Sequence, residues 1–343
     1  MRNTTSSILA LMIAVATGCA AQAPGTPGDD DDDDMENPED LPVPTSPEGR
    51  FNVQSTFDIA TNLPGTAGTV ANYFIQATDD PDDPTKFIVE QILNALPDGS
   101  VKNTLQGSVP LVAGYLNDKL LEVAPNFIDK IVDIGDAFGQ VAKNFGTNEL
   151  VEITSGGRGT KTVTGLHFVV DNVDIDLPFA DFNIEPIKVE NIMVTLNDRG
   201  RLDFAQHVVP MKYGQVMKLA LDYAIIPMID PAASGLEDIL KSVVNCQAVG
   251  QYVFEKINVG SASTFESACN TGLTLAANTL YNQLNNIDTA ALEFNLTGQA
   301  RGIDRNNDSK MDEIQTGVWT GDLKYSGSPA PLSMAKFHGS KTN

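Results

Sequence analysis

The chain has 343 residues, a formal net charge of −23 at pH 7 and a hydrophobic content of 42%. This excess of acids argues against nucleic acid as a partner, because binding to phosphates depends on Lys and Arg. It also argues against a protein that lies flat on an anionic membrane surface. The length is sufficient for one large folded body with an extensive core.

The first feature in chain order is a short apolar run over residues 8–15, preceded by a single base, Arg2. A membrane-spanning helix needs about 20 apolar residues, so the run predicts a cleaved secretory signal and not a span. Small residues at positions 16–18 come directly before Cys19. This stretch resembles the signal peptides of bacterial lipoproteins, although that family usually has Leu where this chain has Ala16.

The resemblance implies that residues 1–18 are removed and that Cys19 becomes a lipid-modified N-terminus, carrying acyl chains such as palmitate. Several acyl chains hold a protein in a bilayer far more firmly than one chain does. The resemblance also implies a cell-envelope location at the bacterial outer membrane, on its periplasmic face or at the cell surface. The alternative is an ordinary signal peptide cleaved near residues 20–23, which would leave a secreted protein.

Residues 19–48 form an acidic segment. Between Ala20 and Glu48 it contains six Pro and ten acids, and it has no Lys or Arg. Such a composition buries too little apolar surface to offset the entropy of ordering the chain. We therefore expect a disordered, lipid-anchored tether that holds the folded body away from the membrane.

Residues 49–343 are expected to form a single large domain, or two closely packed halves with a break near residue 210. Alternating apolar residues predict a strand over 50–59. Asp83 as N-cap and Pro84 at the first helical position begin a predicted helix that ends before Pro97. An apolar helical pattern then runs over 109–145.

The segment 150–209 predicts a β region. "VDIDLPF" alternates apolar residues with Asp174 and Asp176, and "NDRGR" is typical of a hairpin turn. A second helical block is expected over 213–287, with S/T-x-x-E capping boxes that begin at Ser234 and Ser263. "ALEFNLTGQA", "EIQTGVWTGDLKY" and "PLSMAKFHG" predict three final antiparallel strands.

The order of these blocks is β, α, β, α, β. Alternating strands with one solvated face favour antiparallel sheet. The predicted fold class is therefore α+β, with long helices packed on antiparallel, strongly bent sheet.

Two cysteines remain in the body, Cys246 and Cys269. A pair of cysteines in an exported protein predicts a disulfide, which here would join two consecutive helices. The alternative is two buried thiols.

The segment "DRNNDSKMDE" has the spacing of a loop that folds around a hard cation. It resembles DxNxD-type calcium loops and departs from the EF-hand pattern at Ser309, in the glycine position, and at Gln315, in place of the bidentate glutamate. The alternative is a solvated hairpin turn, which favours Asn and Asp for its geometry alone. The sequence thus predicts a structural calcium ion with these ligands: Asp304, Asn306, Asp308, the carbonyl of Lys310, and Asp312.

The sequence shows no catalytic motif: the three histidines are scattered, and no zinc motif, nucleophile elbow or phosphate-binding loop is present. We therefore expect a non-catalytic envelope lipoprotein whose body binds a ligand or an envelope protein, and which contacts the membrane through its lipid.

Two alternatives remain open. One is a tubular-type carrier of lipid or another apolar ligand. The other is an enzyme whose site is assembled only by the fold, for example around His207 or paired acids. An elongated pocket in the helical blocks would favour the carrier, and its lining would include Leu116, Ile131, Phe138 and Val216.

Overall fold

The computed structural model describes residues 41–64, 94, 98–99, 102, 127–170, 173–258 and 260–342. Residues Pro38–Asn343 form one compact unit. The predicted helix that begins at Asp83 and the segment 109–126 lie outside the described residues, and so does the predicted lipidation site, Cys19.

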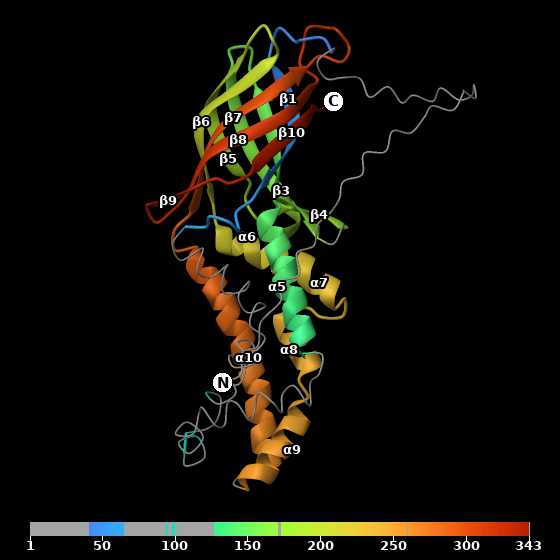
Figure 1. Ribbon diagram of the computed structural model, residues 1–343, viewed down its shortest axis with the longest axis vertical. Coiled ribbons are helices and arrows are strands. Elements are labelled where there is room, and N and C mark those ends of the chain that lie inside the picture. Colours follow the sequence, from blue (N-terminus) through green and yellow to red (C-terminus); the bar gives the residue numbers. More distant parts are fainter. Residues whose placement is uncertain are drawn as a thin grey trace, which may run out of the picture. The chain divides into compact units, whose positions relative to one another are not determined.

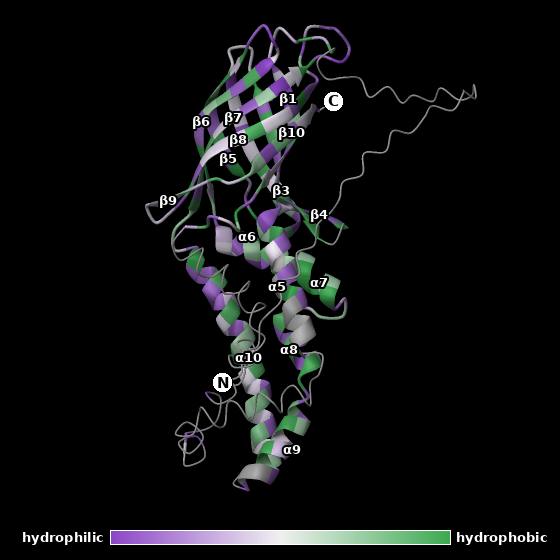
Figure 2. Cartoon of the chain, viewed as in Figure 1, coloured by the Kyte–Doolittle hydropathy of each residue, from purple (hydrophilic) through white to green (hydrophobic). Residues whose placement is uncertain are grey.

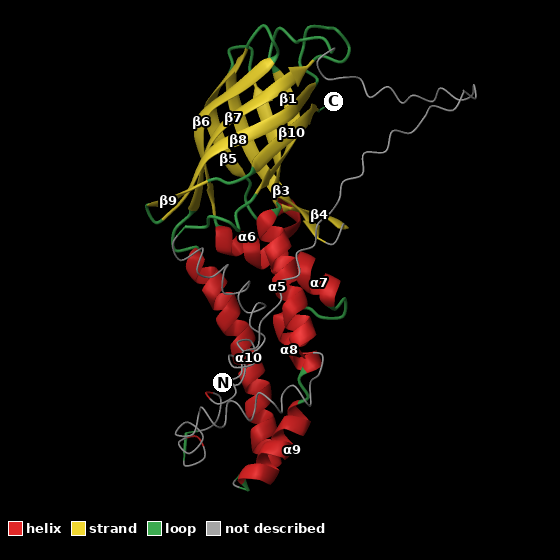
Figure 3. Cartoon of the chain, in the orientation of Figure 1, coloured by secondary structure: helices red, strands yellow, loops and turns green. Residues whose placement is uncertain are grey.

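Eight antiparallel strands close into a barrel (Figure 1 and Figure 3). β10 pairs with both β8 and β1 and so completes the wall. In order around the barrel the strands are β1 (Gly49–Phe57), β2 (Phe145–Ile153), β3 (Arg158–Val170), β5 (Ile187–Leu196), β6 (Arg201–Met211), β7 (Leu292–Ile303), β8 (Glu313–Tyr325) and β10 (Ala335–Lys341). Two short strands extend the wall: β4 (Val173–Pro178) pairs with β3, and β9 (Ser328–Pro331) pairs with β8.

The closed barrel overturns the predicted α+β class, in which long helices pack on a bent sheet. Alternation along a strand predicts one buried face, and this pattern is the same for an open sheet and for a barrel. Closure depends on the pairing of β1 with β10, in which Phe51 lies opposite Lys341. These residues come from the two ends of the body, so no local sequence pattern reports their contact.

The strand alternation places mostly apolar side chains inside the barrel and mostly polar side chains outside it. In β1, Phe51, Val53 and Phe57 are buried, whereas Asn52 is exposed. Figure 2 shows the same alternation of hydrophilic and hydrophobic residues along the strands. An eight-stranded barrel is just wide enough for its own side chains to fill. The interior is therefore a packed core.

The described helices fall in two stretches of the chain, between β1 and β2 and between β6 and β7. Short helical turns at Phe179–Phe182 (η2), between β4 and β5, and at Leu221–Ile225 (η3) add to them. The helices are α5 (Phe127–Lys143), α6 (Tyr213–Ala220), α7 (Ile226–Ile229), α8 (Leu236–Val243), α9 (Cys246–Ile257) and α10 (Ala262–Ile287).

Hydrogen bonds join these helices to the end of the barrel where β6 finishes and β7 begins. The carboxylate of Asp288, just after α10, accepts the amides of Gly214 and Gln215 at 2.7 Å each and so satisfies the start of α6. The Tyr325 hydroxyl at the end of β8 donates to the carbonyl of Ile287 at 2.7 Å. The C-terminal end of α10 is thus fixed both to the start of α6 and to the end of β8.

Candidate functional site

Six buried polar or aromatic side chains meet inside the barrel, and we call them the interior polar cluster: Ser55, Thr147, Glu149, Lys161, His207 and Trp319. Lys161 Nζ lies 3.0 Å from Glu149 Oε2 and 4.2 Å from the centre of the Trp319 ring. The Thr147 hydroxyl donates to Glu149 Oε1 at 2.8 Å, and Trp319 Nε1 donates to Ser55 Oγ at 3.0 Å. The cluster therefore contains a buried ion pair between Lys161 and Glu149, and one oxygen of the Glu149 carboxylate also accepts a hydrogen bond.

Burial sets the protonation of this cluster. Removal from water lowers the pKa of the Lys161 ammonium, and the Glu149 carboxylate opposes that shift. Burial and the Lys161 charge lower the pKa of His207 to about 4, so its imidazole is neutral near pH 7. His207 Nδ1 lies 3.0 Å from the carbonyl oxygen of Ala205, which places the ring proton on Nδ1.

The cavity beside the Lys161–Glu149 pair has a volume of about 10 Å³. It lies between that pair and apolar residues such as Phe57, Met211 and Phe294. This is the space of a single water molecule. An acyl chain could enter this part of the barrel only if the surrounding core repacked.

A larger hollow crosses the outer face of the barrel, and we call it the outer-wall groove. Its volume is about 520 Å³. Its lining comes from five adjacent strands: residues 52–54 of β1, 148–149 of β2, 164 of β3, 313–315 of β8 and 338–340 of β10.

Irregularities in the strand pairing accompany the outer-wall groove. The register shifts between Asn148 and Glu149 in the β2–β3 pairing, and between Phe337 and Gly339 in the β10–β8 pairing. A bulge bends its strand and redirects the neighbouring side chains. Gly339 also has no side chain where a Cβ would lie 2.8 Å from the carbonyl oxygen of Asn52. The groove thus lies where bulges and a glycine interrupt the regular wall.

The rim of the outer-wall groove carries side chains that both donate and accept hydrogen bonds. They are the carboxamides of Asn52, Gln54, Asn148 and Gln315, the hydroxyls of Thr164 and Ser340, and the imidazole of His338. Hydrogen bonds fix the orientation of three of the carboxamides: Gln54 Nε2 donates to Asn148 Oδ1 at 3.2 Å, Asn148 Nδ2 to Asp176 Oδ1 at 2.8 Å, and Gln315 Nε2 to Glu313 Oε2 at 2.7 Å.

Both acids that line the groove are paired with bases. Arg305 binds Glu313 through two nitrogens, with Nη2 3.0 Å from Oε2. The hydrogen bond from Arg305 lowers the pKa of the Glu313 carboxyl. Glu149 lies at the boundary between the groove and the interior, and its carboxylate is paired with Lys161. The groove therefore presents hydrogen-bonding groups with little uncompensated charge.

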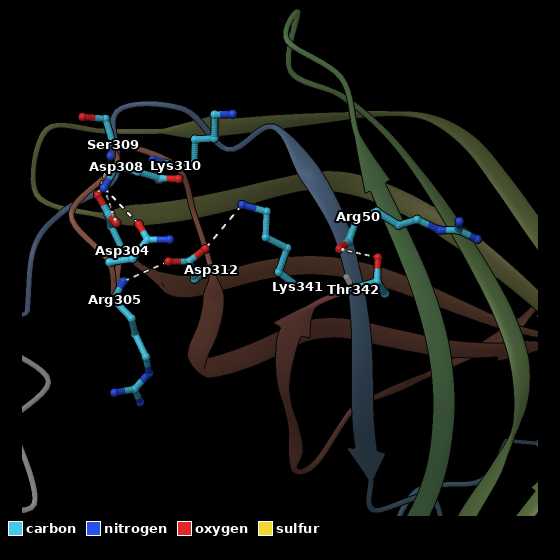
Figure 4. Close-up of polar contacts among 10 residues, drawn as sticks. Arg50, Asp304, Arg305, Asp308, Ser309, Lys310, Asp312, Lys341 and Thr342 are labelled. Carbon is cyan, nitrogen blue, oxygen red and sulfur yellow. Dashed lines mark hydrogen bonds and ion pairs between the residues drawn. The ribbon is translucent and has the colours of Figure 1, made fainter.

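The five predicted calcium ligands lie in one loop between β7 and β8 (Figure 4). The buried Asp304 carboxylate accepts the amides of Asp308 at 3.1 Å and Ser309 at 2.7 Å. Asp312 accepts the Arg305 amide at 3.1 Å and lies 3.3 Å from Lys341 Nζ. Within the described ranges, no group of three or more His, Cys, Asp or Glu side chains is arranged to hold a metal ion. Calcium at this loop stays a prediction.

The last residues of the predicted tether pack against this loop. The Thr45 amide donates to the Ser309 carbonyl at 3.0 Å, and the Asp304 amide donates to the Pro42 carbonyl at 3.1 Å. Ser46 forms an isolated parallel bridge with Lys310. Residues 42–46, which the sequence assigned to the tether, thus form hydrogen bonds and an isolated β-bridge with this loop.

The remaining predicted residues are dispersed. Cys246 and Cys269 form a disulfide between α9 and α10. His167 pairs with Asp176 at 3.1 Å, His207 belongs to the interior polar cluster, and His338 lines the outer-wall groove. Of the four positions proposed for an apolar pocket, Val216 is buried in α6; Leu116 and the side chains of Ile131 and Phe138 lie outside the described residues.

Sequence reasoning missed the outer-wall groove. Its only local signal is the pair of carboxamides at the outward positions Asn52 and Gln54 of β1. Their neighbours Asn148 and His338 come from distant parts of the chain, and only the strand pairing brings them to Gln54.

No family model, no curated protein and no solved structure matches the chain. None of the helices in the described part of the chain is long and apolar enough to cross a membrane.

Proposed function

We propose that this protein is a non-catalytic, lipid-anchored protein of the cell envelope, and that its barrel binds a polar ligand in the outer-wall groove. The observation that carries the binding proposal is the groove itself: about 520 Å³, lined by hydrogen-bonding side chains of five strands. Ligand sites typically have volumes of about 300–1,000 Å³. The cavity beside Lys161 and Glu149 holds only about 10 Å³.

The placement of the groove on paired strands supports binding. Each strand that lines it has a hydrogen-bonded neighbour on both sides. The rim side chains therefore project from a rigid wall, so binding costs little ordering of the backbone. Hydrogen bonds already orient Gln54, Asn148 and Gln315 before a ligand arrives.

The binding proposal is tested by mapping where small polar molecules bind. A ¹⁵N-labelled body would be titrated with N-acetylglucosamine, N-methylacetamide and glycerol at millimolar concentration. We expect amide shifts concentrated at residues 52–54, 148–149, 313–315 and 338–340. The double variant Gln54→Ala/Asn148→Ala should lose them, whereas Gln299→Ala, an exposed carboxamide on β7 outside the groove, should keep them. Shifts concentrated elsewhere would overturn the proposal.

The anchor is supported by the residues around Cys19 and by the acidic composition of the segment that follows. Cys19→Ala, or treatment of cells with globomycin, should move the protein from the membrane fraction to the soluble fraction. Unchanged recovery in the membrane fraction would rule out the lipid anchor.

Carriage of a lipid or other apolar ligand is the second candidate, and the closed barrel with its apolar interior supports it, since carriers use this architecture. The carrier would have to open the packed interior around Phe57, Met211 and Phe294. Mass spectrometry of organic extracts from purified protein tests it. A lipid at one equivalent per chain would favour the carrier, and its absence would reject it.

A further inference from the structure

We propose that the ligand of the outer-wall groove is an uncharged glycan segment. This inference rests on the proposed function, because it names the ligand class of the same groove. It follows from the charge of the lining residues, from the pairing of the strands that carry them, and from the mixture of polar and non-polar atoms in the groove.

The charge of the groove excludes strongly ionic ligands. Of the described residues that line it, none is Lys or Arg, so a phosphate or carboxylate would find no cation to bind. The lining acids do not attract a cation strongly either, since Arg305 binds Glu313 and Lys161 binds Glu149. An uncharged ligand avoids the cost of desolvating an unpaired ion.

The strand backbones argue against a peptide. One recurring mode of peptide binding adds a strand to an exposed sheet edge, which supplies free backbone amides and carbonyls. The groove offers no such edge, because β8, β10, β1, β2 and β3 each pair on both sides. Recognition there must come from side chains.

The groups available suit a sugar. Carboxamides such as Asn52 and Gln54 donate and accept at once, which matches hydroxyl and acetamido groups that also do both. Val53 and Ile314 also line the hollow, although at most 2% of either residue is exposed, and the backbone of Gly339 lies in the same lining without a side chain. A pyranose ring has hydroxyls at its edge and C–H groups on its faces, so it can use both kinds of surface.

The test is isothermal titration calorimetry of the full folded body with three matched tetrasaccharides. They are tetra-N-acetylchitotetraose, which is uncharged, its de-N-acetylated form, which is cationic, and maltotetraose, which is uncharged and lacks acetamido groups. The acetylated peptide amide Ac-SGNT-NH₂ serves as an uncharged polar peptide of similar size. The variants are Gln54→Ala/Asn148→Ala and, as matched control, Gln299→Ala.

We expect at least one uncharged tetrasaccharide to bind saturably, with at least tenfold weaker binding of the cationic form. The groove variant should weaken that binding at least tenfold, and Gln299→Ala should leave it unchanged. If the peptide binds in the groove and neither uncharged sugar does, the glycan assignment is wrong while groove binding stands. If the small polar molecules of the mapping experiment also fail to bind at the groove, both proposals are overturned.

Discussion

Of the side chains inside the barrel, those of Lys161 and Glu149 cost the most free energy to bury. Both side chains are almost fully buried, and neither Lys161 Nζ nor Glu149 Oε2 has a well-directed hydrogen bond, although they lie 3.0 Å apart. A buried ion pair gains little over an apolar pair, but removal of one partner leaves the other charge uncompensated. The pair therefore makes each of the two residues hard to replace alone.

Replacement of Lys161 by Met should lower the free energy of unfolding by about 3–5 kcal/mol, because Glu149 would remain buried without its cation. The double variant Lys161→Met/Glu149→Leu should recover most of that loss. Lys188→Met is the control: Lys188 pairs with Glu190 at 2.6 Å on the exposed wall, and solvent-exposed ion pairs contribute little to stability. Urea titration gives these values. A Lys161→Met loss as small as the control would contradict a buried charged pair.

His207 should make stability depend on pH. Its folded pKa of about 4 lies below the ordinary value of 6.5, so the unfolded chain binds the proton more readily in that interval. Its contribution is complete above pH 6.5 and is lost as the pH falls toward 4, by at most about 3 kcal/mol. Of the charged groups, Lys161 contributes to this shift, because its positive charge opposes protonation of the imidazole and so lowers the pKa of His207.

The variant His207→Phe isolates this effect, because it keeps a ring beside Trp319 and removes the titration. Between pH 6.5 and pH 4 the unfolding free energy of the variant should fall less steeply than that of the parent. Parallel curves would mean that His207 titrates normally in the folded protein.

At the scale of elements, α9 and α10 form a closely packed pair. A Cβ on Gly250 of α9 would lie 2.6 Å from the Ala262 carbonyl oxygen and from the Glu266 amide, so the backbones approach directly. The disulfide between Cys246 and Cys269 joins the same two helices, with 23 residues of sequence separation. Packing and covalent linkage thus fix one helical hairpin.

The double variant Cys246→Ser/Cys269→Ser should lose about 3 kcal/mol of stability in the chain-entropy account of disulfides. Hydrogen exchange should quicken in α9 and α10 and stay slow in β1, β2 and β3. Peptide mapping of non-reduced envelope protein checks the bond itself. If both cysteines of that protein could be alkylated, the disulfide would be absent and the predicted loss of stability would not apply.

The loop of Asp304 is the second element with a testable role, since it joins β7 to β8 and holds the segment 42–46. If it binds calcium, millimolar calcium should raise the melting temperature of chelator-treated protein. Asp304→Ala/Asp308→Ala should remove that response, and Asp198→Ala, an exposed acid in another turn, should keep it. A melting temperature insensitive to calcium and chelator would leave the loop as a hydrogen-bonded turn.

Local signals predicted several elements well, and helix starts less well. The last strands were expected at "EIQTGVWTGDLKY" and "ALEFNLTGQA", and these are β8 and most of β7. Neither capping box formed as predicted. α10 is capped by Ser261, which accepts the Thr264 amide at 3.2 Å, and α8 begins after Gly235. Several neighbouring serines compete to cap α10, so sequence alone could not choose among them.

For the whole molecule, the features tied to function depend on contacts between distant residues. Lys161 lies on β3 two residues after Gly159 and two residues before Val163, so the alternation of the strand indicates that its side chain points inward. The alternation does not indicate that Glu149 is its partner. Barrel closure, the ion pair and the outer-wall groove all arise from strand pairing, and the pairing partners are encoded far apart. Hence the sequence indicated the strands and the turns, but it did not indicate the ion pair or the outer-wall groove.

We propose that the outer-wall groove, and not the barrel interior, holds the ligand. Ser340→Trp would fill the groove from an exposed position on β10 and leave the core untouched; Val318→Trp, at an exposed position on β8 outside the lining, is its control. The measurement is the affinity of both variants and of the parent for tetra-N-acetylchitotetraose or, if only maltotetraose binds the parent, for maltotetraose. We predict at least tenfold weaker binding to Ser340→Trp and unchanged binding to Val318→Trp. Equal affinity for all three proteins would mean that the ligand does not bind in the outer-wall groove.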